Sequence, residues 1–142
     1  MSSEMIRSCL LTRTRQISRV LTSIYDEELR PFGIHSPQFS LLVLISAFGP
    51  LSRADLGRRN HQDRSTLTRN LQPLIERGLV SDDVPGDDGR SRPVSLTEQG
   101  AALLHDAAPA WSAAQAKAKA LMSETGANAI MEIAGELPRR MH

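Results

Sequence analysis

Residues 63–100, DRSTLTRNLQPLIERGLVSDDVPGDDGRSRPVSLTEQG, decide the fold of this chain. The first half of the segment carries an apolar stripe at helical spacing, made of Leu67, Leu71, Leu74 and Ile75. Asp63 is suited to cap the start of this helix, and Gly78 stands where a glycine commonly ends one. We therefore predict one amphipathic helix that begins near Arg64.

The opposite face of this helix carries hydrogen-bonding side chains mixed with guanidinium groups. Its members are Arg64, Ser65, Thr68, Arg69 and Gln72. Such side chains recognise base edges in the major groove, where arginine pairs with guanine and glutamine with adenine. A helix of this kind standing alone is more often a solvated surface helix, so the DNA-binding interpretation depends on the neighbouring segments of the chain.

A β-hairpin is predicted directly after the helix. Residues 79–83 and 92–96 have the composition of short strands, and the PGDDG between them is rich in turn formers. Pro93 suits an edge strand, because proline cannot donate a hydrogen bond to a neighbouring strand. A two-stranded wing beside an arginine-bearing helix favours DNA binding.

The residues before this helix predict a partner for it. Ser52 is suited to cap a short helix over about residues 53–60, which leads through a tight turn to Arg64. Two helices joined in this way form a helix-turn-helix. Further upstream, Ser36 is placed to cap a helix over about residues 37–47, which is apolar nearly all round and should be buried.

Long helices are predicted at both ends of the chain. Residues 5–30 form the first, with an apolar face made of Ile6, Cys9, Leu10, Ile17, Val20, Leu21 and Ile24. Thr97 is suited to cap the second, which extends to about Met122 and should be kinked at Pro109. Ser123 is placed to cap a last helix.

Composition bounds the class of protein. A chain of 142 residues with a formal net charge of +1 suits one domain. We expect no signal peptide or membrane span, because the longest apolar run covers only residues 41–45. The single cysteine, Cys9, fits the reducing cytoplasm, where we expect the protein to act. Fifteen arginines against two lysines suit phosphate and guanine recognition, but a GC-rich coding bias explains them equally well.

Taken in order, these motifs resemble the MarR family of winged helix-turn-helix transcriptional regulators. The resemblance covers nearly the whole chain and rests on LRPFGIHSPQFSLL at 29–42, DRSTLTRNLQPLIERGLV at 63–80 and DDGRSRPVSLTEQG at 87–100. It implies a mainly α fold with a small β-hairpin wing and long terminal dimerisation helices. We expect a single domain, 1–142, with a DNA-binding lobe at 34–100 and dimerisation helices at 1–33 and 101–142.

The resemblance also implies a partner and a site. Family members are homodimers that bind pseudo-palindromic double-stranded DNA, and many release it on binding a small phenolic or lipophilic ligand or on thiol oxidation. The positions that match the family's base-contacting residues are Arg64, Ser65, Thr66, Thr68 and Arg69. Gln72, on the same polar face of the helix, is added to this set. In the wing, Arg90 matches the arginine that enters the minor groove, and Asp88 matches its supporting aspartate. Arg92 is expected at the DNA backbone or the wing stem.

Three features depart from the family pattern. Pro73 lies inside the recognition helix and removes a hydrogen bond to the carbonyl of Arg69, so a bend is expected there. Residues 60–62, Asn-His-Gln, occupy the turn of the helix-turn-helix, where the family more often has an apolar–glycine–apolar run. How this turn packs does not follow from the resemblance. The wing stem is acidic and should be held away from phosphates, through Asp82, Asp83, Asp87 and Asp88.

No residue cluster supports an enzyme, a metal site or a cofactor, and the four histidines lack ligand spacing. A hydrophobic cleft between lobe and dimerisation helices, lined by Phe39, Leu42 and Trp111, is where we expect a small aromatic or lipophilic effector. The alternative is that these side chains fill a closed core. Residues 31–36 and Pro109 are the expected hinges for such control.

Cys9 is open to two interpretations. Peroxide-sensing members carry a reactive cysteine in the first helix, but counting from Thr22 and Tyr25 that position falls on Leu11 here. A small hydrophobe buried at the dimer interface is therefore favoured. We predict a homodimeric repressor. The alternatives are a redox-sensing regulator acting through Cys9 and a winged-helix module that binds protein instead of DNA.

Overall fold

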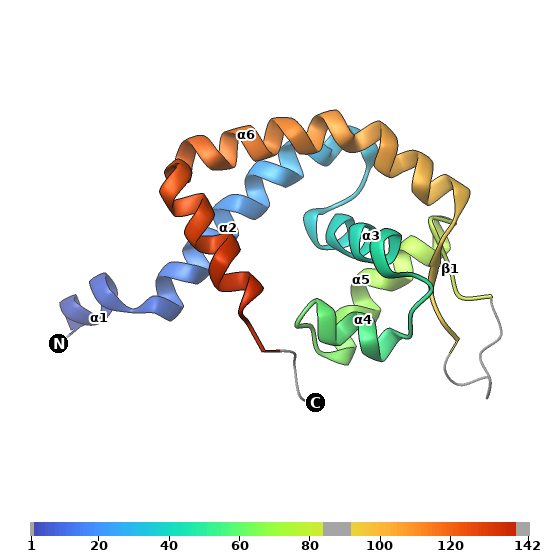
Figure 1. Ribbon diagram of the computed structural model, residues 1–142, viewed down its shortest axis with the longest axis horizontal. Helices are drawn as coiled ribbons and strands as arrows, with labels where there is room; N and C mark the ends of the chain where they lie inside the picture. The colour runs from blue at the N-terminus through green and yellow to red at the C-terminus, as the bar shows by residue number, and fades with distance from the viewer. Residues whose placement is uncertain (1, 84–91, 139–142) are drawn as a thin grey trace.

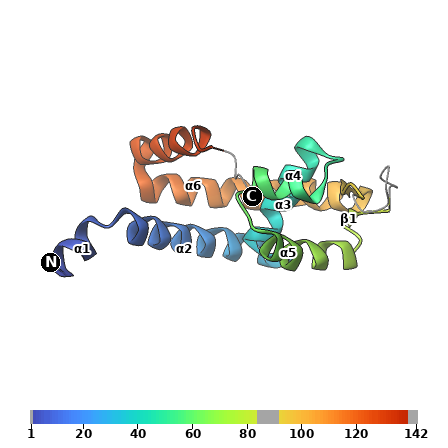
Figure 2. The same cartoon turned by 90° about the horizontal axis from the view of Figure 1, so that it is seen from below.

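The computed structural model describes residues 2–83 and 92–138. Two long helices, α2 (Leu10–Leu29) and α6 (Glu98–Gly135), pack against each other beside a smaller lobe (Figure 1, Figure 2). The contact is reinforced by a hydrogen bond from the Tyr25 hydroxyl to Gln115 and by a 2.5 Å ion pair between Lys117 and Glu28. The Glu28 carboxylate raises the pKa of Lys117.

The N-terminal helix is broken, contrary to the single helix predicted over residues 5–30. Helix α1 (Ser2–Ser8) ends before Cys9, whose extended backbone caps the start of α2. The Cys9 sulfur accepts a 3.5 Å hydrogen bond from the Thr12 backbone N–H. Helix α1 buries no residue, and it projects away from the rest of the chain (Figure 1). No tertiary packing within one chain therefore opposes the break.

The lobe is built around α3 (Ser36–Phe48), which follows the short 3₁₀ helix η1 (Arg30–Phe32). His35, and not Ser36, is the N-cap, because the Ser36 backbone N–H and hydroxyl are both bound to Asp26 Oδ1 at 2.6 and 2.5 Å. The predicted burial of this helix is only partly confirmed: Phe39, Leu41, Leu42 and Ile45 are buried, whereas Val43 and Phe48 are exposed. The core consists of Leu29, Ile34, Phe39, Leu41, Leu42, Ile45, Leu51, Leu56, Leu67, Leu71, Leu74, Leu79, Val80, Val94 and Ala107.

Among the described helices, none is by itself long and apolar enough to cross a membrane. Only Leu10–Phe32 and Ser36–Phe48, which meet at 77°, reach such a composition when they are counted together.

Helices α4 (Arg53–Arg59) and α5 (Arg64–Glu76) form the predicted helix-turn-helix, with the predicted caps. Ser52 accepts from the Asp55 N–H at 3.0 Å, and Asp63 accepts from the Thr66 N–H at 2.7 Å. In the turn, the Gln62 N–H donates to the Gly57 carbonyl at 2.9 Å. A Cβ on Gly57 would lie only 3.2 Å from the Gln62 oxygen, so the glycine permits this close approach.

Helix α5 continues as one helix through Pro73 to Glu76. Gly78, just beyond the helix end, adopts a left-handed φ of 74°. Glycine reaches this conformation without steric strain, which explains why the helix stops here, as predicted.

The wing is shorter than predicted within the described residues. Strands β1 (Val80–Ser81) and β2 (Ser95–Leu96) pair antiparallel, and an isolated bridge joins Leu51 to Val94. The wing tip, including Asp88 and Arg90, lies outside the described residues.

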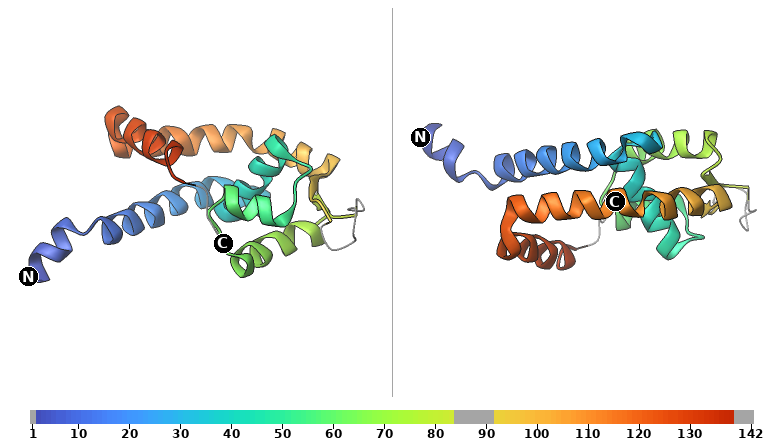
Figure 3. Two further views of the ribbon diagram at one scale, coloured as in Figure 1. Left: turned by 60° about the horizontal axis from the view of Figure 1, so that its bottom comes forward. Right: turned by 90° about the horizontal axis from the view of Figure 1, so that it is seen from above.

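Helix α6 begins at the predicted Thr97 cap, which accepts from the Gly100 N–H at 3.0 Å. The backbone remains helical at Pro109 and departs from helical angles at Ser123, with φ 65° and ψ 166°. Pro109, where the sequence predicts a kink, thus causes no break in the helical backbone angles, and it lies on an exposed part of α6. Ser123 caps the following segment by accepting from Gly126 at 3.3 Å, as predicted, and that segment turns back toward the lobe (Figure 3).

Candidate nucleic-acid interface

Helix α5 separates an apolar face from a polar one, as its sequence predicts. Leu67, Leu71 and Leu74 are buried in the core. The opposite face presents five exposed side chains and the half-buried Thr66; the exposed ones are Arg64, Ser65, Thr68, Arg69 and Gln72. The structure thus brings all six expected α5 residues to one stretch of helix.

Two arginines on this face are available for a ligand. Within residues 2–83 and 92–138, neither Arg64 nor Arg69 forms an ion pair. Their neighbours are locally engaged: Ser65 donates to Asp63 at 3.0 Å, and Gln72 donates to Glu76 at 3.5 Å. A guanidinium without an internal ion pair loses no partner when it binds an anion or a guanine edge, so these two arginines are the strongest candidates for DNA contact.

The other arginines between residues 53 and 77 have different roles. Arg53 pairs with Asp82 across 3.0 Å. Arg59 pairs with Asp55 at 3.2 Å and lies over the Phe48 ring, 4.0 Å from its centroid. The arginine count in this stretch therefore overstates the charge available to DNA. Asp82, expected to repel phosphates, is instead neutralised by Arg53.

A groove of about 430 Å³ opens beside the exposed polar face of α5, between α4, α5 and the wing stem. Its charged described lining consists of Arg53, Arg58, Arg64 and Arg92. Arg53 pairs with Asp82 and Arg58 with Asp55 at 3.5 Å, so Arg64 and Arg92 are the two without an ion pair among the described residues. Arg92, far from Arg64 in the sequence, thereby lines the same groove. The planar donor forks of arginine match the geometry of phosphate oxygens, so the groove can hold a phosphate of the DNA backbone.

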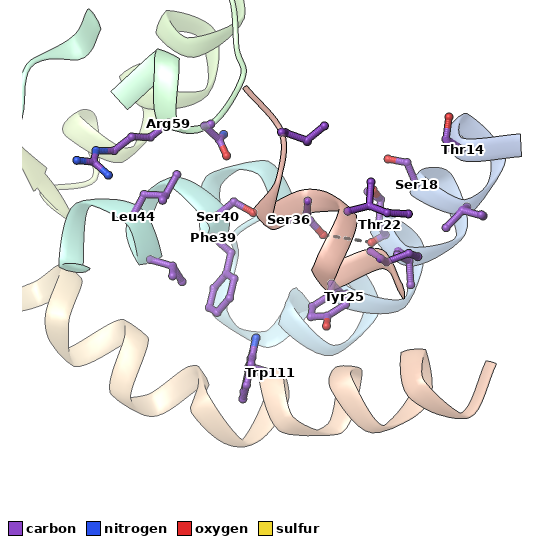
Figure 4. Close-up of a pocket in the computed structure, with 18 residues that line it drawn as sticks. Thr14, Ser18, Thr22, Tyr25, Ser36, Phe39, Ser40, Leu44, Arg59 and Trp111 are labelled. Carbon is purple, nitrogen blue, oxygen red and sulfur yellow. Dashed lines mark hydrogen bonds between the residues drawn. The ribbon is translucent and has the colours of Figure 1, made fainter. Parts of the chain in front are cut away.

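A second and larger cleft, of about 730 Å³, lies between α2, α3 and both parts of α6 (Figure 4). Phe39 and Trp111 line it as expected, and Figure 4 shows them facing a common space with Tyr25. Leu42 does not line it, because this side chain is fully buried in the lobe core. Burial raises the pKa of Tyr25.

Sequence reasoning missed most of the walls of this cleft. They come from α2 and from the segment after Ser123, and include Ile17, Leu21, Ile130, Ile133 and Leu137. Periodicity marked these residues as apolar, but their convergence depends on how α6 turns back at Ser123. Arg59 is the one cation in the described lining, and it is already paired with Asp55 and stacked on Phe48. The cleft therefore suits a mainly apolar molecule.

Cys9 lies away from both sites, half-buried at the start of α2. Interactions with the Thr12 side chain, and then with its backbone N–H, lower the pKa of the Cys9 thiol. Among the described residues no group of three His, Cys, Asp or Glu side chains is placed to hold a metal ion.

Known proteins resemble this chain in sequence over more than half of its length. The model of the MarR family matches residues 32–91. Two Bacillus subtilis proteins are similar over 90 residues: the uncharacterized HTH-type transcriptional regulator YwoH, at 30% identity, and the organic hydroperoxide resistance transcriptional regulator, at 33%. The match covers 63% of this chain in both cases, and 65% and 61% of the two relatives, less than two thirds of their length.

A solved structure gives a fuller match. The transcriptional regulator MosR of Mycobacterium tuberculosis is 34% identical, with a TM-score of 0.76, over 90% of this chain and 92% of MosR. A second MosR structure, at the same identity and a TM-score of 0.72, is a complex with DNA.

Proposed function

Because the chain belongs to the MarR family of transcriptional regulators, we propose that it binds a specific DNA operator as a homodimer and represses transcription. The observation that carries the proposal is the presence of Arg64 and Arg69, without ion pairs among the described residues, on the exposed face of α5 next to the four-arginine groove. As a regulator of chromosomal DNA it acts in the cytoplasm. The DNA complex of MosR supports DNA as the partner.

Two kinds of contact are proposed for each lobe. Ser65, Thr66, Thr68 and Gln72 lie with Arg64 and Arg69 on the helix that enters the major groove, where they contact base edges. Arg92 and Arg58 hold the neighbouring phosphates. Arg90, supported by Asp88, reaches the minor groove from the wing tip; both residues lie outside the described ones, and this part of the proposal rests on the family resemblance.

The homodimer is proposed from the apolar surface that one chain leaves uncovered. Of thirteen large exposed hydrophobic side chains among the described residues, ten lie on α1, α2 or residues 121–137. The most exposed are Leu10 at 81% and Met131 at 72%. Exposed apolar surface of this extent marks an interaction site. We assign residues 1–33 and 101–142 to the dimer seam and residues 34–100 to the DNA-binding lobe.

An effector is proposed for the 730 Å³ cleft, because the cleft joins the proposed seam to the lobe. It suits a small aromatic or lipophilic molecule, because most of its described lining is apolar. Such a ligand releases DNA only to the extent that it binds the DNA-incompetent arrangement more tightly. The check is Trp111 fluorescence, with operator affinity, across a panel of aromatic carboxylates. If neither signal responds, the cleft has no such role.

A redox role for Cys9 is the second candidate, favoured by its lowered pKa. One feature opposes a thiol hydrogen-bonded to tyrosines, the arrangement that the resemblance to peroxide-sensing members implies. Cys9 and the single tyrosine, Tyr25, are separated by about 24 Å along α2 at 1.5 Å per residue. The Tyr25 hydroxyl donates to Gln115 instead. Operator binding that survives in Cys9→Ser but no longer responds to an organic hydroperoxide would establish the redox role.

The proposed function is tested on DNA flanking the gene for this protein. Fluorescence anisotropy should give an affinity that falls steeply as salt rises, because bound phosphates release counterions. A scrambled duplex of equal length is the control. Transcription in vitro from the bound promoter should decrease; an increase would contradict repression. A chain that binds a protein partner with little salt dependence, and binds no duplex specifically, would support the protein-interaction alternative.

A further inference from the structure

One arginine of the helix-turn-helix region points away from the recognition face. Arg77 follows the last residue of α5, and its guanidinium spans back to the junction between α2 and α3. Nη1 donates to the Gly33 carbonyl at 2.8 Å, and Nη2 donates to the Phe32 carbonyl at 3.2 Å. These partners are 44 and 45 residues away in the sequence.

The acceptors explain why an arginine fits this place. Phe32 ends η1, which continues directly from α2, and Gly33 adopts a left-handed φ of 68°. The last carbonyls of a helix have no partner within it and carry partial negative charge. Two such oxygens on consecutive residues match the planar fork of a guanidinium. Lysine, with a single ammonium, cannot hold both in this geometry.

The contact joins the two parts of the molecule that the proposed function assigns to different tasks. Phe32 and Gly33 lie at the end of the α2 segment, which belongs to the dimer seam. Arg77 lies at the end of the recognition helix. On the other side of that end, the Thr97 hydroxyl donates to the Gly78 carbonyl at 2.6 Å. The C-terminal end of α5 is therefore held from two directions.

We propose that Arg77 is a positioning residue for DNA recognition, which sets the angle of α5 relative to α2 and touches no DNA. This inference rests on the proposed function. Arg64 and Arg77 are about 20 Å apart along the helix, at 1.5 Å per residue. A rotation of α5 about its fixed end by about 1° therefore moves Arg64 by about 0.35 Å, given that same rise per residue. A few degrees displace the base-contacting side chains by a large part of a hydrogen-bond length.

Core packing alone does not fix this angle. Leu67, Leu71 and Leu74 hold α5 against the lobe, but apolar contacts are not directional. The two hydrogen bonds from Arg77 are directional, and they are exposed. Exposed hydrogen bonds contribute little to global stability, so loss of the clamp should leave the fold intact while it frees the helix to swing.

The test compares four variants with the parent on one mapped operator. Arg77→Met removes the fork, and Arg77→Lys keeps the charge without it. Arg92→Met removes a proposed phosphate contact, and Arg30→Met is the matched control, since it removes an exposed arginine from η1 beside the same junction. Each is measured for affinity, for the slope of log affinity against log salt, and for the preference for the operator over a version with one extra base pair between half-sites. Thermal unfolding confirms the fold.

Arg77→Met and Arg77→Lys should both bind roughly 3- to 30-fold more weakly than the parent, the range of a coupling contact. Their salt slope should equal that of the parent, and their preference for the correct spacing should be smaller. Arg92→Met should instead lower the slope by about 1.8, because the dimer loses one phosphate contact, worth about 0.9, in each half-site. Arg30→Met should match the parent.

Three results would overturn the positioning role: a parental affinity for Arg77→Met, full recovery in Arg77→Lys, or a salt slope reduced as in Arg92→Met. A loss of folded fraction with unchanged spacing preference would also count against it, because a purely structural role has that effect. If the parent binds no operator specifically, the proposed function itself fails, and the positioning role fails with it.

Discussion

Replacing Arg69 by methionine should weaken operator binding severely while leaving the free protein almost unchanged. Arg69 is exposed and forms no ion pair with the described residues, so its removal strands no buried partner. A surface change of this kind alters stability by about 0.5 kcal/mol or less. The effect on DNA is larger, because an arginine bound to a guanine contributes about 1–3 kcal/mol.

In the proposed dimer this effect on DNA affinity is doubled. Each operator half-site loses one contact, so the total loss is about 2–6 kcal/mol, or roughly 30-fold to 10⁴-fold in affinity. The assay is fluorescence anisotropy on the parent operator and on duplexes with each base pair changed symmetrically in both half-sites. Arg69→Met should lose its preference at one position only. Affinity within twofold of the parent at every position would refute the proposed recognition face, and Arg30→Met controls for the lost charge.

Three further predictions concern the core, the cleft and the seam. Leu71→Ala should lower the free energy of unfolding by about 2–5 kcal/mol in a urea titration, because Leu71 is fully buried; a loss below about 1 kcal/mol, less than the transfer of about two methylenes, would contradict its place in the core. Absorbance titration of the single tyrosine, Tyr25, should give a midpoint above its ordinary value of about 10. Because burial favours the neutral phenol, the stability contributed by Tyr25 is complete below the ordinary pKa of about 10 and is lost as pH rises through the higher pKa of the folded state. A titration midpoint at or below about 10 would mean that Tyr25 is solvated. Met131→Glu with Ile133→Glu should convert the dimer to monomer in sedimentation, whereas a monomeric parent would remove the proposed seam.

Local hydrogen-bond chemistry explains which features could be predicted from the sequence. Ser52, Asp63 and Thr97 start helices at the predicted residues, because each side chain satisfies an N–H two or three residues ahead. The burial of Leu67, Leu71 and Leu74 follows from their spacing alone. The face of α5 opposite those residues was predictable for the same reason.

Contacts between distant segments explain which features could not be predicted. The roles of Arg53, Arg59 and Arg77 depend on Asp82, Phe48 and the Phe32–Gly33 carbonyls, and an arginine count cannot distinguish them. The junction at residues 31–36, expected as a hinge, is tied to Asp26 through Ser36 and to Arg77.

One further miss has a local cause. Cysteine is a weak capping residue, so a break at Cys9 left little signal in the sequence. The break of α6 at Ser123, by contrast, was predicted, because the Ser123 side chain caps the segment that follows.

The most direct test of the central claim is quantitative footprinting of the parent and an Arg64→Met, Arg69→Met double variant on DNA flanking the gene. Two copies of α5 in one dimer should protect two half-sites about 10 base pairs apart, centre to centre, because successive major grooves repeat every 34–36 Å. The double variant should lose this protection at every concentration below that of non-specific binding. An unprotected region, or a footprint unchanged in the double variant, would contradict the claim that α5 recognises DNA through Arg64 and Arg69.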